Sequence, residues 1–140
     1  MGAEIILKKI EQSEKLLTQL EQLLQLPFTQ FENGSTTLRA AERNFQLIVE
    51  IASDMNTQLL LESAKQAPET YKQSFVDLAA LGIIDKTLAA QLLKSARLRN
   101  ILVHEYDFEE DERKFYDSAK IALPAHRNYL KILFKYVTAK

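Results

Sequence analysis

Residues 38–59, LRAAERNFQLIVEIASDMNTQL, carry the most regular pattern in the sequence. The apolar positions are Leu38, Ala41, Phe45, Ile48, Ala52, Met55 and Leu59. Steps of three and four residues align these side chains along one face of an α-helix, whereas a β-strand would need alternation with a period of two. The segment is therefore predicted to form most of a helix of about 25 residues that packs one face against a core.

The same spacing predicts a helix before this segment, over residues 3–26. Its apolar positions are Ile6, Ile10, Leu17, Leu20 and Leu24. Pro27 ends that helix, because a proline disfavours helical geometry in the residue before it. Asn33 and Gly34 then mark a loop that leads into the central helix.

Three more helices are expected after Pro68. They are a short helix with Tyr71, Phe75 and Leu78 on its buried face, a helix from Lys86 to about His104 or Tyr106, and a last helix with a buried stripe from Tyr116 to Val137. Gly82 is expected to cap the end of the first, and Asp85 and Asp111 to cap the starts of the other two. Pro124 predicts a bend in the last helix.

Composition agrees with a helical protein. The chain has 140 residues, with only 3 Gly, 3 Pro and no Cys. Few turn residues and no period-two segments predict an all-α, up-and-down bundle of five helices, with residues 1–140 as a single domain. The absence of cysteine excludes disulfides, cysteine-based zinc sites and thiol catalysis. No apolar run is long enough to span a bilayer, so we expect a cytoplasmic protein.

The formal net charge of −1 excludes a global positive field, so any contact with RNA needs a local basic patch. Such a patch surrounds one of the two histidines, in the segment Arg97-Leu-Arg-Asn-Ile-Leu-Val-His-Glu-Tyr106, with Lys94 one turn earlier. The other histidine, His126, lies on the apolar stripe of the last helix and is interpreted as a core or interface imidazole with one hydrogen-bond partner.

The candidate catalytic residues are Arg99 and His104. An imidazole can act as general acid or base near neutral pH, and a guanidinium can bind a phosphate through paired donors. Together they suit attack of a ribose 2′-hydroxyl on the adjacent phosphodiester, a reaction that needs no metal. No metal site or other cofactor is expected, and the acidic run 107–112 is interpreted as a solvated turn plus helix cap, or as a docking surface for a basic partner.

Helix geometry favours two copies of the site. On an ideal α-helix Arg99 and His104 are about 140° apart, whereas Arg99 and Tyr106 are about 20° apart, and Arg97, Asn100 and His104 share the other flank. Apolar residues also occupy several faces of this helix, which favours a homodimer contact through it. Two copies meeting at a two-fold axis would bring two imidazoles and two guanidinium groups to one cleft.

The motif Arg99-x4-His104-x-Tyr106 resembles that of the HEPN superfamily, and within it the HepT-like toxins. Residues 81–85, Leu-Gly-Ile-Ile-Asp, and the segment from Arg39 to Asp54 are also similar to that family. Family members often have a glycine and an aromatic residue before the motif arginine, where this chain has Arg97 and Leu98.

The resemblance implies a homodimeric, metal-independent RNase that acts as the toxin of a toxin–antitoxin pair, with Arg99 and His104 as its catalytic residues. It also implies an antitoxin that is a minimal nucleotidyltransferase of the MntA type and transfers AMP to Tyr106. An adenylate on Tyr106 would compete with RNA phosphate for Arg99.

Several residues and functions stay open at this point. Asn100, Arg97 and Lys94 are candidate substrate-binding or supporting residues, and Asp54 is either a supporting residue or solvated helix surface. The chain is alternatively a non-catalytic helical module that binds a nucleotidyltransferase, or a protein whose cleft binds a nucleotide as substrate or regulator. The absence of a glycine-rich phosphate loop disfavours the last of these.

Overall fold

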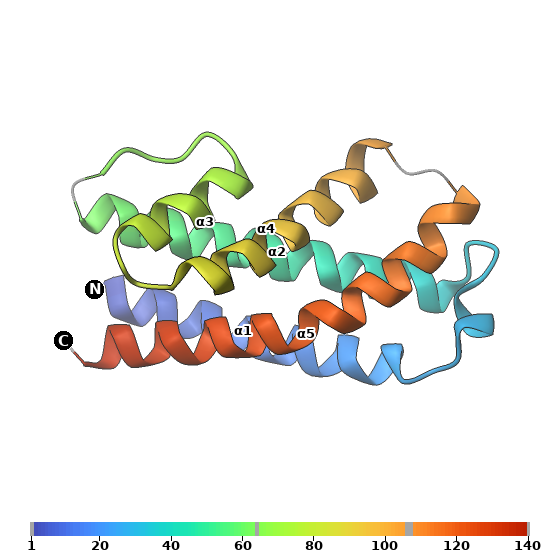
Figure 1. The fold of residues 1–140 in the computed structure, drawn as a ribbon. Helices are drawn as coiled ribbons and strands as arrows, with labels where there is room; N and C mark the ends of the chain where they lie inside the picture. The colour runs from blue at the N-terminus through green and yellow to red at the C-terminus, as the bar shows by residue number, and fades with distance from the viewer. Residues whose placement is uncertain (1, 64, 106–107, 140) are drawn as a thin grey trace.

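The computed structural model describes residues 2–63, 65–105 and 108–139, with side chains 104–111 excepted. Every regular element in these ranges is helical (Figure 1). The elements are α1 (Gly2–Leu24), a 3-10 helix η1 (Phe28–Phe31), α2 (Thr36–Glu62), α3 (Tyr71–Ala80), α4 (Lys86–Asn100), a π-helix η2 (Ile101–Glu105) and α5 (Phe108–Thr138). The described residues therefore confirm the all-α bundle of five α-helices.

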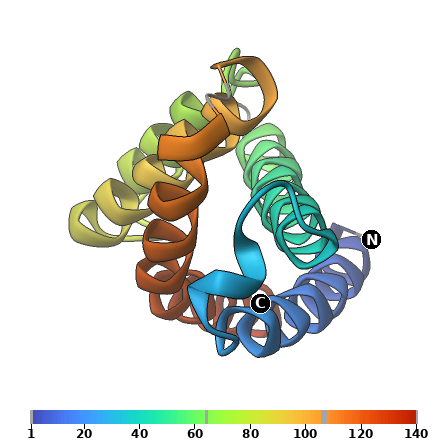
Figure 2. The ribbon, with the colours of Figure 1, turned by 90° about the vertical axis from the view of Figure 1, so that its right-hand side faces the viewer.

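The helices surround one apolar core (Figure 2). Helix α2 packs against α1 and α3, α5 packs against α1 and α4, and the chain begins and ends at the same end of the bundle (Figure 1). All seven apolar positions predicted for α2 are buried, as are the five predicted for α1. None of the described helices combines the length and the apolar composition that crossing a lipid bilayer requires.

Helix ends follow the sequence signals at Gly82 and Asp85. The Asp85 carboxylate accepts a hydrogen bond from the Leu88 N–H at 2.7 Å and so caps α4. Gly82 adopts φ +80°, and the next residue, Ile83, donates its N–H to the Leu78 carbonyl at 3.3 Å. The left-handed conformation at this position lets backbone N–H groups after α3 bond to its last carbonyls, and glycine adopts that conformation without steric cost.

A buried polar chain links three helices. The Tyr129 hydroxyl of α5 donates to Asn56 Oδ1 of α2 at 2.6 Å, and Asn56 Nδ2 donates to Ser74 Oγ of α3 at 3.1 Å. Ser74 in turn donates to the carbonyl of Tyr71 at 2.7 Å. Each member has a partner, which removes the penalty of burying these polar groups, and burial raises the pKa of Tyr129.

The start of α5 corrects one expectation. The helix begins at Phe108, so Asp111 lies inside its first turn and is not the N-cap residue. Pro124 is accommodated within the helix, whose axis changes direction partway along its length (Figure 1). The predicted bend is therefore present without a break in the helix.

The interpretation of the acidic run 107–112 as a solvated turn is wrong where the run is described. Its backbone is helical from Phe108 onward, and Glu112 is only 4% exposed. The Glu112 carboxylate accepts hydrogen bonds from the N–H groups of Asn33 and Gly34, at 3.1 and 2.9 Å. Both turn residues have positive φ, 60° and 66°, so α5 clamps a left-handed turn that precedes α2.

Replacing Glu112 with alanine is expected to reduce the free energy of unfolding by about 2 kcal/mol, because two backbone donors lose their acceptor. Glu112→Gln retains one carbonyl oxygen and should lose less. Urea unfolding monitored by circular dichroism measures the change, with Glu11→Ala as the control, since the ion pair of Glu11 with Lys15 is exposed. A Glu112→Ala protein as stable as this control would contradict the clamp.

Candidate active site

Arg99 lies in the last turn of α4, and its guanidinium is held between α2 and α3. Its Nη2 is 3.1 Å from Glu50 Oε2, and its Cζ lies 4.5 Å from the ring centre of Tyr71. The side chain of Arg99 is 16% exposed and that of Glu50 is 31% exposed. Partial burial makes this ion pair and cation–π contact stronger than surface contacts, so the guanidinium has a defined position.

Asn100 completes the surroundings of Arg99. Its Oδ1 accepts a hydrogen bond from Arg99 Nη1 at 3.4 Å, so Asn100 contacts Arg99 directly, although an ideal helix places it on the flank of Arg97. Arg99 Nε is buried and has no hydrogen-bond partner among the described residues. Within the described part of the chain, one N–H on each Nη remains after the bonds to Asn100 and Glu50, which leaves two donors for an anion.

Glu50 is the acidic residue that the sequence analysis did not select. Asp54, which it considered as a supporting residue, is 63% exposed and forms an ion pair with Lys9 at 3.7 Å. The two carboxylates are one turn apart on the same helix, so periodicity alone does not distinguish them. Only the position of α4 against α2 shows that Glu50 is the one within reach of Arg99.

The backbone changes from α-helix to π-helix directly after Arg99 and Asn100. Residues Ile101–Glu105 form η2, whereas the sequence predicted an α-helix as far as His104 or Tyr106. A π-helix has i→i+5 hydrogen bonds and a wider turn, so the angle of about 140° between Arg99 and His104 on an ideal α-helix does not apply. The His104 side chain and all of Tyr106 lie outside the described residues.

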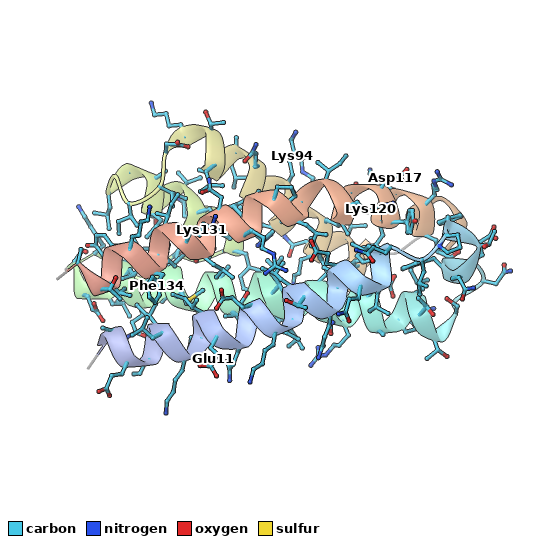
Figure 3. The ribbon with its side chains drawn as sticks, turned by 90° about the horizontal axis from the view of Figure 1, so that it is seen from below. Glu11, Lys94, Asp117, Lys120, Lys131 and Phe134 are labelled. Carbon is cyan, nitrogen blue, oxygen red and sulfur yellow. The ribbon has the colours of Figure 1, made fainter. Side chains whose placement is uncertain are left out.

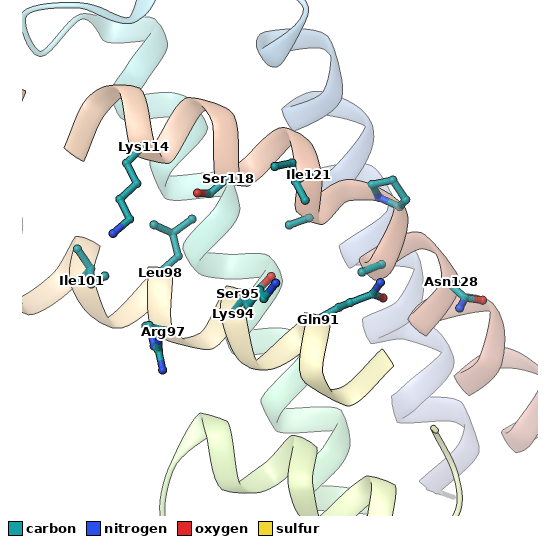
Figure 4. Close-up of a pocket in the computed structure, with 13 residues that line it drawn as sticks. Gln91, Lys94, Ser95, Arg97, Leu98, Ile101, Lys114, Ser118, Ile121 and Asn128 are labelled. Atoms are coloured by element: carbon teal, nitrogen blue, oxygen red, sulfur yellow. The ribbon is translucent and has the colours of Figure 1, made fainter. Parts of the chain in front are cut away.

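Arg97 and Lys94 line a groove between α4 and α5, with a volume of about 810 Å³ (Figure 4). Arg99 is not part of this lining, since its guanidinium contacts α2 and α3. The basic residues expected around His104 therefore divide between two sides of α4. Among the described residues, no group of three or more His, Asp or Glu side chains could hold a metal ion.

His126 is confirmed as a core residue with one hydrogen-bond partner. It is buried, its Nε2 lies 3.0 Å from Ser95 Oγ, and its ring packs edge-on to that of Phe45. Burial without a charged partner lowers the pKa of His126 from 6.5 to about 4. The imidazole is thus neutral at pH 7 and has no access to a substrate.

Fold and site together define a small helical protein with a partly buried arginine at the start of a π-helical motif. The family model described as Ribonuclease HepT-like matches residues 13–133, and the chain belongs to this family. It is also similar to a protein named tRNA nuclease HepT from Aphanizomenon flos-aquae (strain 2012/KM1/D3), at 27% identity over 133 residues that cover 95% of this chain and 90% of the relative.

Solved structures share the fold. A mutant MntA–HepT toxin–antitoxin complex aligns with a TM-score of 0.82 at 22% identity, over 92% of this chain and 97% of the other. A tri-AMPylated Shewanella oneidensis HEPN toxin in complex with MNT antitoxin aligns with a TM-score of 0.78 at 22% identity, over 92% and 96% of the two chains. The Bacillus subtilis protein YutE aligns with a TM-score of 0.70 at 18% identity, over 92% and 90%.

The low pKa of His126 predicts a loss of stability in acid. Above pH 6.5 the imidazole is neutral in both the folded and the unfolded chain, but between pH 6.5 and 4 only the unfolded chain takes up the proton. This linkage is expected to remove about 3 kcal/mol of unfolding free energy by pH 4. Urea unfolding from pH 7.5 to 4.5 should show a fall in the wild type that is flatter in His126→Gln. Parallel curves would contradict the assignment.

Proposed function

We propose that this chain is a metal-independent RNA endonuclease and the toxin of a toxin–antitoxin pair, with an active site shared by two copies of the chain. The observation that carries the proposal is the position of Arg99, which is desolvated and oriented by Glu50 and Tyr71 directly before the segment that contains His104. Membership of the HepT-like ribonuclease family and similarity to a tRNA nuclease support RNA as the substrate class.

The proposed reaction is attack by a ribose 2′-hydroxyl on the adjacent phosphodiester. One His104 imidazole accepts the hydroxyl proton as the 2′-oxygen bonds to phosphorus. The bond from phosphorus to the 5′-oxygen breaks, and a second imidazole donates a proton to that leaving oxygen. The products are a 2′,3′-cyclic phosphate and a 5′-hydroxyl end. Arg99 donates its remaining Nη hydrogens to the non-bridging oxygens, whose negative charge increases in the transition state.

Glu50 and Tyr71 act as positioning residues in this scheme. A free arginine side chain has many rotamers, and fixing one of them before the substrate arrives removes an entropic cost from the reaction. Glu50 takes one hydrogen bond from Nη2, and the Tyr71 ring covers one face of the guanidinium. The Arg99 guanidinium therefore stays charged, and its unbonded N–H groups point in a defined direction.

A dimer supplies what one chain lacks. A single imidazole cannot easily serve as both base and acid within one turnover, whereas two related by a two-fold axis can. The same symmetry doubles the local positive charge of Arg99, Arg97 and Lys94, in a chain whose formal net charge is only −1. Arg97 and Lys94 are proposed to bind substrate phosphates, with Asn100 supporting Arg99.

Purified wild-type protein is expected to cleave RNA in the presence of EDTA. His104→Ala should reduce the rate by about 10²- to 10⁴-fold, the usual contribution of a general acid or base. Arg99→Lys should also impair cleavage, because lysine keeps the charge but not the planar fork. Gel analysis of a 5′-labelled RNA measures the rates.

Lys131→Ala is the control for these variants, since Lys131 is exposed on α5 (Figure 3) and should retain the wild-type rate. Equal cleavage by wild type and His104→Ala would identify a contaminating nuclease and refute the proposal. Loss of cleavage in EDTA would refute metal independence.

The proposed regulation is AMP transfer to Tyr106 by an MntA-like nucleotidyltransferase antitoxin. The solved complexes of HEPN toxins with MNT antitoxins, one of them tri-AMPylated, support this partner. Each adenylate adds a phosphate anion and bulk close in sequence to Arg99. The added phosphate would occupy guanidinium donors that RNA otherwise needs.

Coexpression with a nucleotidyltransferase of this type is expected to increase the intact mass of the protein by whole AMP units. Tyr106→Phe should abolish the increase, because it removes the hydroxyl that accepts AMP, and Tyr136→Phe serves as the control that is still modified. Intact-mass spectrometry measures the change. An unchanged wild-type mass, or modification of Tyr106→Phe, would contradict the assignment.

A non-catalytic module that binds the nucleotidyltransferase is the second candidate. It is favoured by the contacts of Arg99 with Glu50 and Tyr71 within a single chain, since an arginine so engaged also stabilises the bundle. The module would bind its partner but would neither cleave RNA nor arrest growth when expressed alone.

A further inference from the structure

The groove between α4 and α5 has positive charge on both of its walls. Lys94 and Arg97 lie one turn apart on α4, and Lys114 extends from α5 toward α4 beside Leu98 (Figure 4). The polar residues that complete the lining are Gln91, Ser95, Ser118 and Asn128. None of the lining residues is a carboxylate, so within the described chain this groove favours an anion.

The three cations are not neutralised by other described residues. Lys94, Arg97 and Lys114 form no ion pair there, whereas Arg113 and Arg127 on α5 pair with Asp117 and Glu21, at 3.3 and 3.4 Å. A cation without a carboxylate partner keeps its full attraction for an incoming phosphate. The described part of the groove therefore gathers three cations without ion-pair partners in a chain that is close to neutral overall.

The middle of the groove is apolar. Leu98 and Ile101 contribute from the α4 side, and Ile121, Ala122, Pro124 and Ala125 contribute from α5. Ile121 is 78% exposed, so its side chain offers apolar surface to a ligand in the groove. The volume of about 810 Å³ falls in the range of about 300–1,000 Å³ typical of small-ligand sites. An apolar surface edged by cations matches the planar base and the phosphate of a nucleotide.

A second copy of the chain fits this groove less well. In a two-fold contact through the groove, Lys94, Arg97 and Lys114 of both copies would be gathered in one interface. Like charges brought together in a desolvated interface are strongly unfavourable. The dimer proposed above must therefore leave the groove open or fill it with anions.

We propose that this groove binds a nucleotide of single-stranded RNA adjacent to the scissile linkage, with the phosphate on Lys94, Arg97 and Lys114 and the base on the apolar surface. The proposal rests on the ribonuclease function and adds a binding site to it. The groove extends to Ile101, the first residue of η2, so a strand that leaves it reaches the segment containing His104. Arg97 and Arg99 then contact successive parts of one strand from two sides of α4.

Binding is measured by fluorescence anisotropy with a 2′-O-methyl oligoribonucleotide, which lacks the attacking hydroxyl and is not cleaved. Lys94→Ala/Lys114→Ala is expected to bind at least about tenfold more weakly than wild type, and the slope of log affinity against log salt should fall by about 0.7, the value for one phosphate contact of a single strand. Lys131→Ala/Lys135→Ala, which removes two exposed lysines of α5 outside the groove, is the matched control.

Ile121→Glu tests the apolar surface, because a carboxylate there repels phosphate. Ile121 is exposed, so the glutamate stays in water and the core is not disturbed. It should weaken RNA binding and leave the oligomeric state unchanged in light scattering. Dissociation of the oligomer with unchanged RNA affinity would assign the groove to a second copy and overturn the proposal.

The binding and cleavage assays can refute the groove and the ribonuclease function independently of each other. A wild-type protein that cleaves RNA, with a Lys94→Ala/Lys114→Ala variant that binds like the control, overturns the groove and retains the ribonuclease. A protein that binds RNA through the groove but never cleaves it retains the groove and overturns the ribonuclease. A wild-type protein that does not bind the oligoribonucleotide overturns the groove.

Discussion

Burial of the apolar stripe of α2 is the constraint on which the rest of the structure depends. Its seven positions from Leu38 to Leu59 are all buried, so this helix can lie in only one rotation within the bundle. That rotation directs its polar flank, and with it Glu50, toward the end of α4. The candidate active site is therefore positioned by the packing of a helix that does not itself carry the Arg99-x4-His104 segment.

Polar contacts then fix how the other helices meet α2. The buried chain from Tyr129 through Asn56 to Ser74 ties α5 and α3 to the same helix, and Glu112 ties the start of α5 to the turn before it. Apolar packing alone tolerates small shifts between helices, but a buried hydrogen bond does not, because an unpaired polar group is costly. Tyr71, which contacts Arg99, is held by the same hydrogen-bond network, because Ser74 donates to its carbonyl.

The sequence predicted the helices well because their signals are local. The stripes of α1 and α2, the cap at Asp85 and the left-handed Gly82 each depend on residues within one or two turns, and each was confirmed. Asp111 and Glu112 were misinterpreted for the opposite reason, since the partners of Glu112 are about 80 residues away in the chain. Glu50 was not selected over Asp54 because only the tertiary position of Arg99 separates them. The catalytic roles of Arg99 and His104 remain predictions.

The π-helix changes the turn geometry within the motif segment. In an α-helix, residues four apart lie above one another and residues five apart diverge, whereas i→i+5 bonding brings residues five apart closer together on the surface. Arg99 and His104 are five residues apart, and the wider turn begins at Ile101, between them.

The same widening interrupts the regular α-helical hydrogen bonding, which is unfavourable in an ordinary helix of a bundle. Such a cost is typical of functional sites, where local geometry serves the chemistry and the surrounding packing stabilises it. This segment combines a π-helix with a desolvated guanidinium on one side of α4 and unpaired cations on the other. The proposed binding of one RNA strand depends on this combination, because it places cations on both sides of α4.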